Sequence, residues 1–206
     1  RLREINKWIK GKPSGLLMRK KVLLDFLTEI IIDAELWLGF CELTPEEQEI
    51  ERNNLSAVEQ FWYFVLFPRW LNEPDPKLPK WKQEILKDNY DRDDETQIRQ
   101  LEHSIKYCGG QVYRNMILDF SMATDLLVSG FLGQALCVQL TISSPQNTNE
   151  KIRLWRETLN YWSIERALFM SFNPCGQYRD SRKLAALLIE QSNDLPTHGC
   201  QETYLV

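Results

Sequence analysis

Two apolar runs joined by a glycine-bearing segment constrain the fold of this chain more than any other feature of its sequence. The runs are Ala123–Val128 and Ala135–Ile142, and the segment between them, Ser129–Gln134, contains Gly130 and Gly133. Short apolar runs bounded by turn residues are typical of buried strands. Glycine allows the backbone to reverse direction between them. The sequence therefore predicts an antiparallel β-hairpin.

Each predicted strand carries polar residues within its apolar run. Asp125 interrupts the first run, and Gln139 and Thr141 interrupt the second. Since side chains alternate along a strand, Gln139 and Thr141 share one face, and we expect Asp125 to meet them across the ladder. The alternative interpretation is a buried hairpin of another α/β fold, in which these polar residues have no chemical role.

This arrangement resembles the PD-(D/E)xK phosphodiesterase superfamily, which has the restriction-endonuclease-like fold. In that family an Asp on one strand and a D/E-x-K on the next hold a divalent metal ion and polarise a water molecule. The matching positions are Asp125, Gln139 and Thr141, with thirteen residues between the first two. Two positions depart from the pattern, because Gln supplies a neutral oxygen and Thr carries no positive charge. The resemblance extends roughly from Asp93 to Pro174.

The order of the predicted elements agrees with this resemblance. Hydrophobic periodicity predicts helix, strand, strand, strand, helix, strand, helix. The three helices and the last strand are expected at Glu95–Cys108, Glu150–Trp162, Lys183–Gln191 and Ile164–Phe172. The implied fold class is α/β (α+β), a restriction-endonuclease-like mixed sheet flanked by helices, with a helical N-terminal extension.

The resemblance also implies a site for Mg²⁺ or Mn²⁺. Asp125 would be its anionic ligand, Gln139 and the Leu140 carbonyl would be neutral oxygen ligands, and Glu102 would be a second anion from the helix before the first strand. On position alone, Glu102 could equally be an exposed helix residue.

The lysine that is missing at position 141 must come from elsewhere if the chain hydrolyses phosphodiesters. Lys151, in the first turn of the predicted crossover helix, is the nearest in sequence, and Arg153 and Arg156 are rivals. The expected catalytic residues are therefore Asp125, Gln139 and Lys151.

A proline-rich segment suggests a domain boundary. Leu71–Pro79 contains three prolines, which predict a rigid connector. We expect a helical N-terminal region over residues 1–73 and a nuclease-like domain over residues 74–206. Helices are predicted in the first region at Leu2–Ile9, from about Leu16 to Phe40, from Pro45 toward Asn54 and at Ala57–Trp70.

The predicted helix Ala57–Trp70 carries the densest aromatic cluster of the chain. Its members are Phe61, Trp62, Tyr63, Phe64, Phe67 and Trp70. Core packing, or an interface with a protein partner or a second copy of the chain, is the expected role of such a cluster. Stacking of nucleobases on the rings is the alternative.

Charge is segregated along the sequence. The whole chain has a formal net charge of −4. Residues 1–21 carry about +7 by the usual charges of their side chains, with Trp8 among the basic residues. Such a segment could bind the phosphate backbone of nucleic acid through counterion release, with DNA the expected partner. The alternative is a solvated surface and an ordinary helix start.

The most apolar predicted helix contains four carboxylates. Asp25, Glu29, Asp33 and Glu35 interrupt Val22–Phe40, which argues against a membrane span and a membrane partner. The first three are four residues apart and form an acidic stripe. Such a stripe is usually a solvated face, and a cation site is the alternative.

The five cysteines include no C-x-x-C pair. Their odd number and scattered positions argue against a zinc site and favour reduced thiols in a cytoplasmic protein. Three functional hypotheses follow from the whole sequence: a metal-dependent nuclease, a pseudonuclease that binds nucleic acid without cutting it, and a helical protein-interaction domain.

Overall fold

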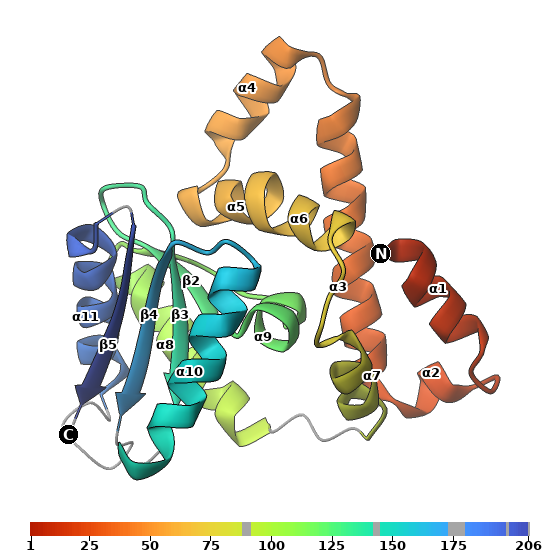
Figure 1. The fold of residues 1–206 in the computed structure, drawn as a ribbon. Coiled ribbons are helices and arrows are strands. Elements are labelled where there is room, and N and C mark those ends of the chain that lie inside the picture. The colour runs from red at the N-terminus through yellow and green to blue at the C-terminus, as the bar shows by residue number, and fades with distance from the viewer. Residues whose placement is uncertain (88–91, 142–144, 173–179, 197, 206) are drawn as a thin grey trace. The chain divides into compact units, whose positions relative to one another are not determined.

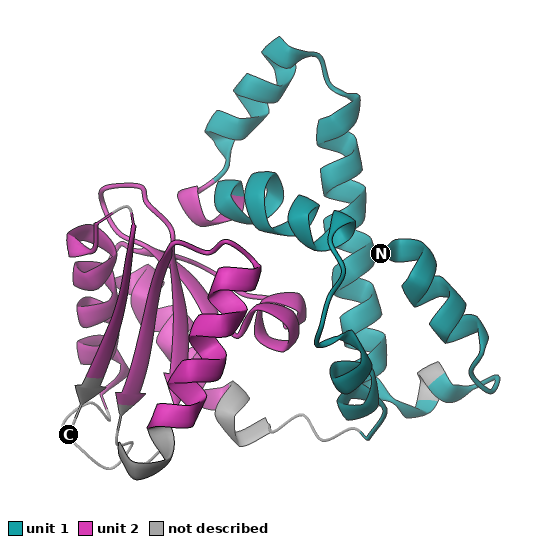
Figure 2. Ribbon diagram, viewed as in Figure 1, with its two compact units in different colours: residues 1–55, 60–91 teal, residues 56–59, 92–206 magenta. Residues whose placement is uncertain are grey.

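The computed structural model describes residues 1–87, 92–141, 145–172, 180–196 and 198–205. The chain is a mixed α/β protein whose five-stranded mixed sheet is flanked by helices (Figure 1). It divides into two compact units, unit 1 (residues 1–55 and 60–91) and unit 2 (residues 56–59 and 92–206), as Figure 2 shows. Two predicted positions, Ile142 and Pro174, lie outside the described residues.

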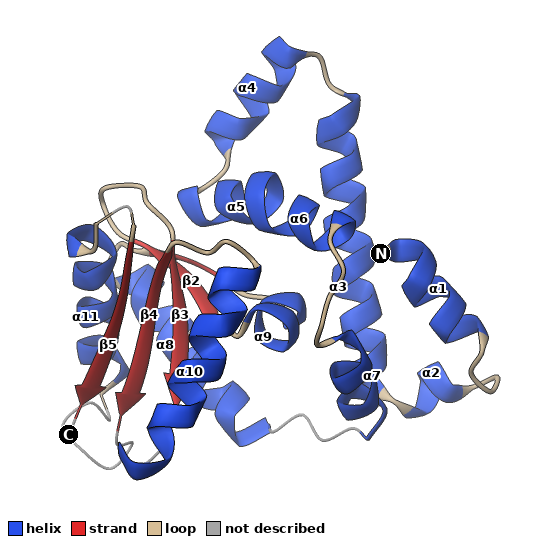
Figure 3. Cartoon of the chain, viewed as in Figure 1, coloured by secondary structure: helices blue, strands red, loops and turns tan. Residues whose placement is uncertain are grey.

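The sheet of unit 2 has its strands in sequence order, β1-β2-β3-β4-β5 (Figure 3). β1, β2 and β3 are antiparallel to one another, whereas β4 is parallel to β3 and β5 is parallel to β4. The strands are β1 (Gln111–Tyr113), β2 (Leu126–Ser129), β3 (Leu136–Thr141), β4 (Arg166–Phe172) and β5 (Gly199–Leu205). The two parallel connections contain helices α10 (Pro145–Tyr161) and α11 (Ser181–Asp194).

Helices cover both faces of this sheet. One face packs against α8 (Arg92–Tyr107) and α11, in a core that alternate strand residues such as Val138 and Leu168 share with Ile105 and Leu188. The other face packs against α10, where the rings of Trp155 and Phe169 are 5.4 Å apart. Since β3 alternates between these faces, the polar side chains of Gln139 and Thr141 lie on the α10 face.

The predicted hairpin is confirmed, and its first strand is shorter than expected. β2 and β3 pair with Leu126 opposite Val138. Ala123 has a positive φ of 50° and ends helix α9 (Met116–Met122), so the strand begins only after Asp125. Helix α9 corrects the expectation that residues 112–142 are all strands and turns. Asn115 caps it by accepting a hydrogen bond from the Leu118 N–H.

β5 was not anticipated from the sequence. It pairs in parallel with β4 over seven positions, from Gly199 opposite Arg166 to Leu205 opposite Phe172. The other predicted elements of this unit are present, with ends that differ by a few residues: the helices Glu95–Cys108, Glu150–Trp162 and Lys183–Gln191, and the strand Ile164–Phe172.

Unit 1 consists of helices. The long helix predicted from Leu16 is interrupted at Lys20, whose backbone (φ −120°, ψ 90°) is not helical. The described helices are α1 (Leu2–Lys10), α2 (Leu16–Arg19), α3 (Lys21–Glu42), α4 (Pro45–Asn54), α5 (Ala57–Phe61), a π-helical turn (Trp62–Leu66), α6 (Phe67–Asn72) and α7 (Leu78–Lys87). Thr44 and Glu47 form the capping box at the start of α4.

The proline-rich connector lies inside unit 1, so the predicted boundary at residues 73/74 differs from the division in the structure. Asp75, within the connector, accepts hydrogen bonds from the indole N–H groups of Trp70 (3.2 Å) and Trp81 (3.0 Å). Trp81 in turn packs against Phe26 of α3, with ring centroids 4.9 Å apart. These contacts hold α6, α7 and α3 in one body.

Two expectations about unit 1 are decided by burial. The aromatic residues Trp62, Tyr63, Phe67 and Trp70 are buried, which favours the core interpretation for these four. Asp33 is also buried and accepts a 2.9 Å hydrogen bond from the Tyr63 hydroxyl, so the acidic stripe is not a solvated face throughout. None of the helices in the described residues is long and apolar enough to cross a bilayer.

Candidate functional site

Asp125 and Gln139 lie directly across the hairpin from each other. Leu126 pairs with Val138, so the antiparallel register places residue 125 opposite residue 139. The Asp125 N–H donates to the Val138 carbonyl at 2.8 Å. The predicted meeting of these two residues is therefore confirmed, and both are half-buried.

One carboxylate oxygen of Asp125 accepts two hydrogen bonds from β3. Gln139 Nε2 donates to Oδ2 at 2.7 Å, and the Leu140 N–H donates to the same atom at 2.6 Å. The chain before Asp125 turns away into α9, where the Thr124 N–H donates to the Leu118 carbonyl. The Asp125 carboxylate thus accepts a hydrogen bond from a backbone amide of β3 at the point where β2 begins.

The orientation of Gln139 bears directly on its predicted role as a ligand. Its Nε2 also donates to the Leu140 carbonyl at 3.2 Å. The Asp125 carboxylate and the Leu140 carbonyl are both hydrogen-bond acceptors. The nitrogen of the Gln139 amide therefore faces them, and its oxygen does not. Three of the predicted metal ligands, Asp125, Gln139 and the Leu140 carbonyl, are therefore brought together and hydrogen-bonded to one another.

Glu102 of α8 pairs with a residue that the sequence did not single out. Its carboxylate is 3.4 Å from Arg114 Nε, and the two side chains are 22% and 23% exposed. Arg114 follows β1, whose last residue, Tyr113, pairs with Leu127. The ion pair lies at the end of the sheet where β2 begins. A cation next to Glu102 could not be recognised from the sequence, because 11 residues and a turn separate the two.

Lys151 of α10 lies beside Thr141, the residue that the resemblance places at the third position of the motif. Its Nζ is 3.3 Å from Thr141 Oγ1, and the side chain is otherwise exposed. The rival cations have other partners: Arg153 pairs with Glu157 at 2.6 Å, and Arg156 pairs with Glu202. Among the three candidates, the described contacts place only Lys151 beside the motif.

These donors do not fit a tightly held divalent cation. Mg²⁺ gives up its water ligands reluctantly and needs anionic compensation. Within the described part of the chain, no three His, Cys, Asp or Glu side chains form a group that could hold a metal ion. Asp125 already accepts two N–H groups, Gln139 presents its nitrogen, and Glu102 is paired with Arg114.

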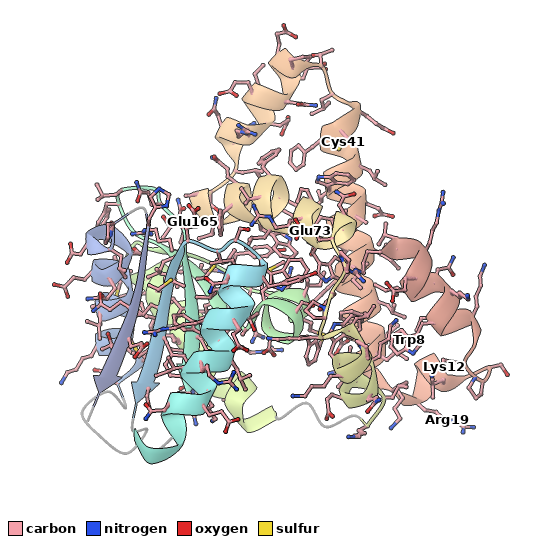
Figure 4. The ribbon with its side chains drawn as sticks, in the orientation of Figure 1. Trp8, Lys12, Arg19, Cys41, Glu73 and Glu165 are labelled. Atoms are coloured by element: carbon pink, nitrogen blue, oxygen red, sulfur yellow. The ribbon has the colours of Figure 1, made fainter. Side chains whose placement is uncertain are left out.

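A second candidate surface lies on unit 1. Two lysines lie close to the Trp8 ring, with Lys12 Nζ 5.7 Å and Lys82 Nζ 5.5 Å from its centroid. Trp8 and Lys12 are labelled in Figure 4, beside α7. Lys82 was missed in the sequence because it belongs to α7, 70 residues further along. Arg1 is not part of this surface, since its guanidinium donates to the Trp70 carbonyl and its side chain is only 4% exposed.

On α1 the exposed basic residues Arg3, Lys7 and Lys10 are three or four residues apart and therefore share one helix face. Together with Lys12 and Trp8 they form what we call the α1 basic surface. Lys82 is not part of this surface, because it pairs with Glu4 at 3.4 Å and its side chain is only 16% exposed. Cations alternating with an aromatic ring are typical of surfaces that contact phosphate and bases.

No protein-family model matches this chain. Similarly, no curated protein and no solved structure shows significant similarity to it.

Proposed function

We propose that this chain is a nuclease-like protein that binds nucleic-acid phosphodiesters and has weak or no hydrolytic activity. The observation that carries the proposal is the convergence of Asp125, Gln139, Thr141 and Lys151 on one face at one end of the sheet. Asp125, Gln139 and Thr141 are the residues matched to the motif in the resemblance to the PD-(D/E)xK superfamily, and Lys151 would supply the missing cation. The order of α8, the strands β1 to β3, α10 and β4 is compatible with that resemblance, whereas α9 and β5 are additions to the expected order.

Lys151 is the residue we assign to phosphate binding at this site. It is exposed, its closest described partner is a neutral hydroxyl, and its charge replaces the one that Thr141 cannot supply. A lysine ammonium binds phosphate as a point charge. Asp125 and Gln139 would then maintain the strand geometry under Lys151 rather than act on substrate.

The α1 basic surface supports nucleic acid as the partner. Arg3, Lys7 and Lys10 present three charges along one helix face, and Lys12 lies close to the aromatic ring of Trp8. Each phosphate that such residues neutralise releases counterions and adds affinity that depends on salt. DNA is the expected ligand, and the experiment below compares the binding of DNA with that of RNA.

Metal-dependent hydrolysis remains the second candidate because the resemblance implies it. Mg²⁺ or Mn²⁺ would be required, with Asp125 as ligand. The hydrogen bonds on Asp125 Oδ2 and the ion pair on Glu102 weigh against it, since they engage the carboxylates that a metal would need.

Incubation of the purified chain with plasmid DNA, with labelled duplex and single-stranded DNA oligonucleotides and with labelled RNA separates these candidates. We expect shifted bands in chelator and no cleavage with Mg²⁺ or Mn²⁺. Cleavage that requires metal and disappears in Asp125→Ala would establish the enzyme instead. Absence of any shift with DNA or RNA would refute nucleic-acid binding.

A further inference from the structure

Helix α3 presents an apolar stripe to solvent. Leu24, Ile31 and Leu38 are 48%, 56% and 49% exposed. Side chains seven residues apart drift by only about 20° around a helix, so these three form one row. The row is about 21 Å long at 1.5 Å per residue. The opposite side of α3 is different, because Phe26 and Ile30 are buried there.

Charges at the two ends of this stripe are of opposite sign. Lys20 and Lys21 lie at its N-terminal end, and Glu35 and Glu42 lie toward its C-terminal end. Within the described residues, none of these four forms an ion pair.

This placement of charge does not stabilise the helix itself. The helix macrodipole favours acidic residues in the first turn and basic residues in the last turn. α3 has no acidic residue in its first turn and no basic residue in its last turn, while Lys21 and Glu42 occupy those turns. The macrodipole of α3 therefore does not account for the charges at the two ends of the stripe.

A second copy of α3, running antiparallel, has that complementarity. With a two-fold axis at Ile31, Leu24 of one copy faces Leu38 of the other, since both are seven residues from the axis. Lys21, the first residue of α3, likewise faces the last turn of the other copy, which ends at Glu42, because Lys21 and Glu42 are ten and eleven residues from the axis. We propose that α3 is a self-association surface through which two copies of this chain form an antiparallel, two-fold symmetric dimer.

Sedimentation velocity over a range of protein concentrations tests the proposal. The wild type is expected to show a concentration-dependent dimer. Ile31→Glu, which brings two like charges together at the axis, is expected to be a monomer. Ile50→Glu is the matched control, because Ile50 is 61% exposed on α4 and lies off the stripe. A wild type that stays monomeric up to its solubility limit, or a dimer that persists in Ile31→Glu, would overturn the proposal.

Charge reversal tests the antiparallel direction. Lys20→Glu combined with Lys21→Glu should weaken the dimer by about tenfold or more, because like charges then face each other at both ends. Glu35→Lys with Glu42→Lys should do the same through Glu42, since Glu35 is four residues from the axis and faces the uncharged Leu27. All four changes in one chain should restore the dimer. Failure of the fourfold variant to dimerise, with its melting curve unchanged, would refute the antiparallel arrangement.

Discussion

Gln139 and Asp125 are joined by a 2.7 Å hydrogen bond from Nε2 to Oδ2, and the Leu140 N–H donates to the same oxygen at 2.6 Å. A single carboxylate oxygen thus links the start of β2 to the end of β3. The same hydrogen bonds that preserve the hairpin engage the group that a catalytic metal would need. This relationship is the reason why we favour binding over hydrolysis.

Replacement of Asp125 is expected to destabilise the fold whether or not metal is present. Asp125→Ala leaves the Leu140 N–H without its acceptor, which should lower the free energy of unfolding by about 1–3 kcal/mol. Urea unfolding in chelator and in Mg²⁺ measures this. Glu190→Ala, an exposed change on α11, is the control and should stay within about 0.5 kcal/mol. A Mg²⁺-dependent stabilisation of the wild type that Asp125→Ala lacks would indicate a metal ligand instead.

Arg166 is expected to be the most sensitive buried polar residue of unit 2. Its guanidinium donates to the backbone carbonyls of Gln134, Ala135, Ser192 and Leu195, and thereby connects β4 to the hairpin turn and to the end of α11. Arg166→Met should lower the free energy of unfolding by about 3 kcal/mol or more, because several buried carbonyls lose their donor.

Arg166→Lys should recover only part of this loss, since an ammonium cannot reproduce the planar fork of the guanidinium. Arg153→Met, at an exposed ion pair, serves as the control for the removal of an arginine. Equal stabilities for Arg166→Met and Arg153→Met would contradict this expectation.

Sequence alone predicted the hairpin and the position of Asp125 opposite Gln139, because alternation along two apolar runs fixes which side chains share a face. It did not predict α9, since the helix Met116–Met122 is largely buried and its apolar residues show no helical period. It also missed β5, in which polar residues such as Gln201 and Glu202 interrupt the apolar pattern. The position of Lys151 in the sequence was enough to propose it as the cation of the site. The structure was needed to prefer it to Arg153 and Arg156, because only the structure shows that these two arginines form ion pairs with glutamates.

Cys137 is expected to resist alkylation in the folded protein. Burial in the sheet raises the pKa of its thiol to about 12 from an ordinary value of 9.0, so little thiolate forms at pH 9. Iodoacetamide treatment followed by peptide mapping should modify the exposed Cys41 and spare Cys137 until the protein is unfolded. Equal modification rates for Cys41 and Cys137 in the native protein would contradict this prediction.

The same pKa shift has a consequence for stability. The folded state holds the Cys137 proton more tightly than the unfolded state, so this contribution is fully present below pH 9 and is lost as the pH rises toward 12. The thermal midpoint should therefore fall over this range. Cys137→Ala should show a shallower fall than the wild type, and an identical slope would contradict the assignment.

The α1 basic surface is expected to set the salt dependence of nucleic-acid binding. Removal of residues 1–12 would also remove the buried Ile5 and would disturb the fold, so substitution is the sharper test. Changing Arg3, Lys7 and Lys10 to Gln should reduce the slope of log affinity against log salt by about 0.9 for each phosphate of duplex DNA that the variant no longer neutralises. Titrations at several salt concentrations measure the slope, and an unchanged value would assign these residues to a solvated surface.

Fluorescence anisotropy of a labelled DNA duplex, titrated with the chain in the presence of chelator, tests the central claim most directly. We expect binding without metal, affinity that falls as salt rises, and a weaker complex for Lys151→Gln than for Lys106→Gln, which removes an exposed charge from α8. Lys151→Gln should also reduce the salt slope by about 1, because one phosphate is then no longer neutralised. No salt-dependent binding of duplex DNA, single-stranded DNA or RNA by the wild type would contradict the proposed function.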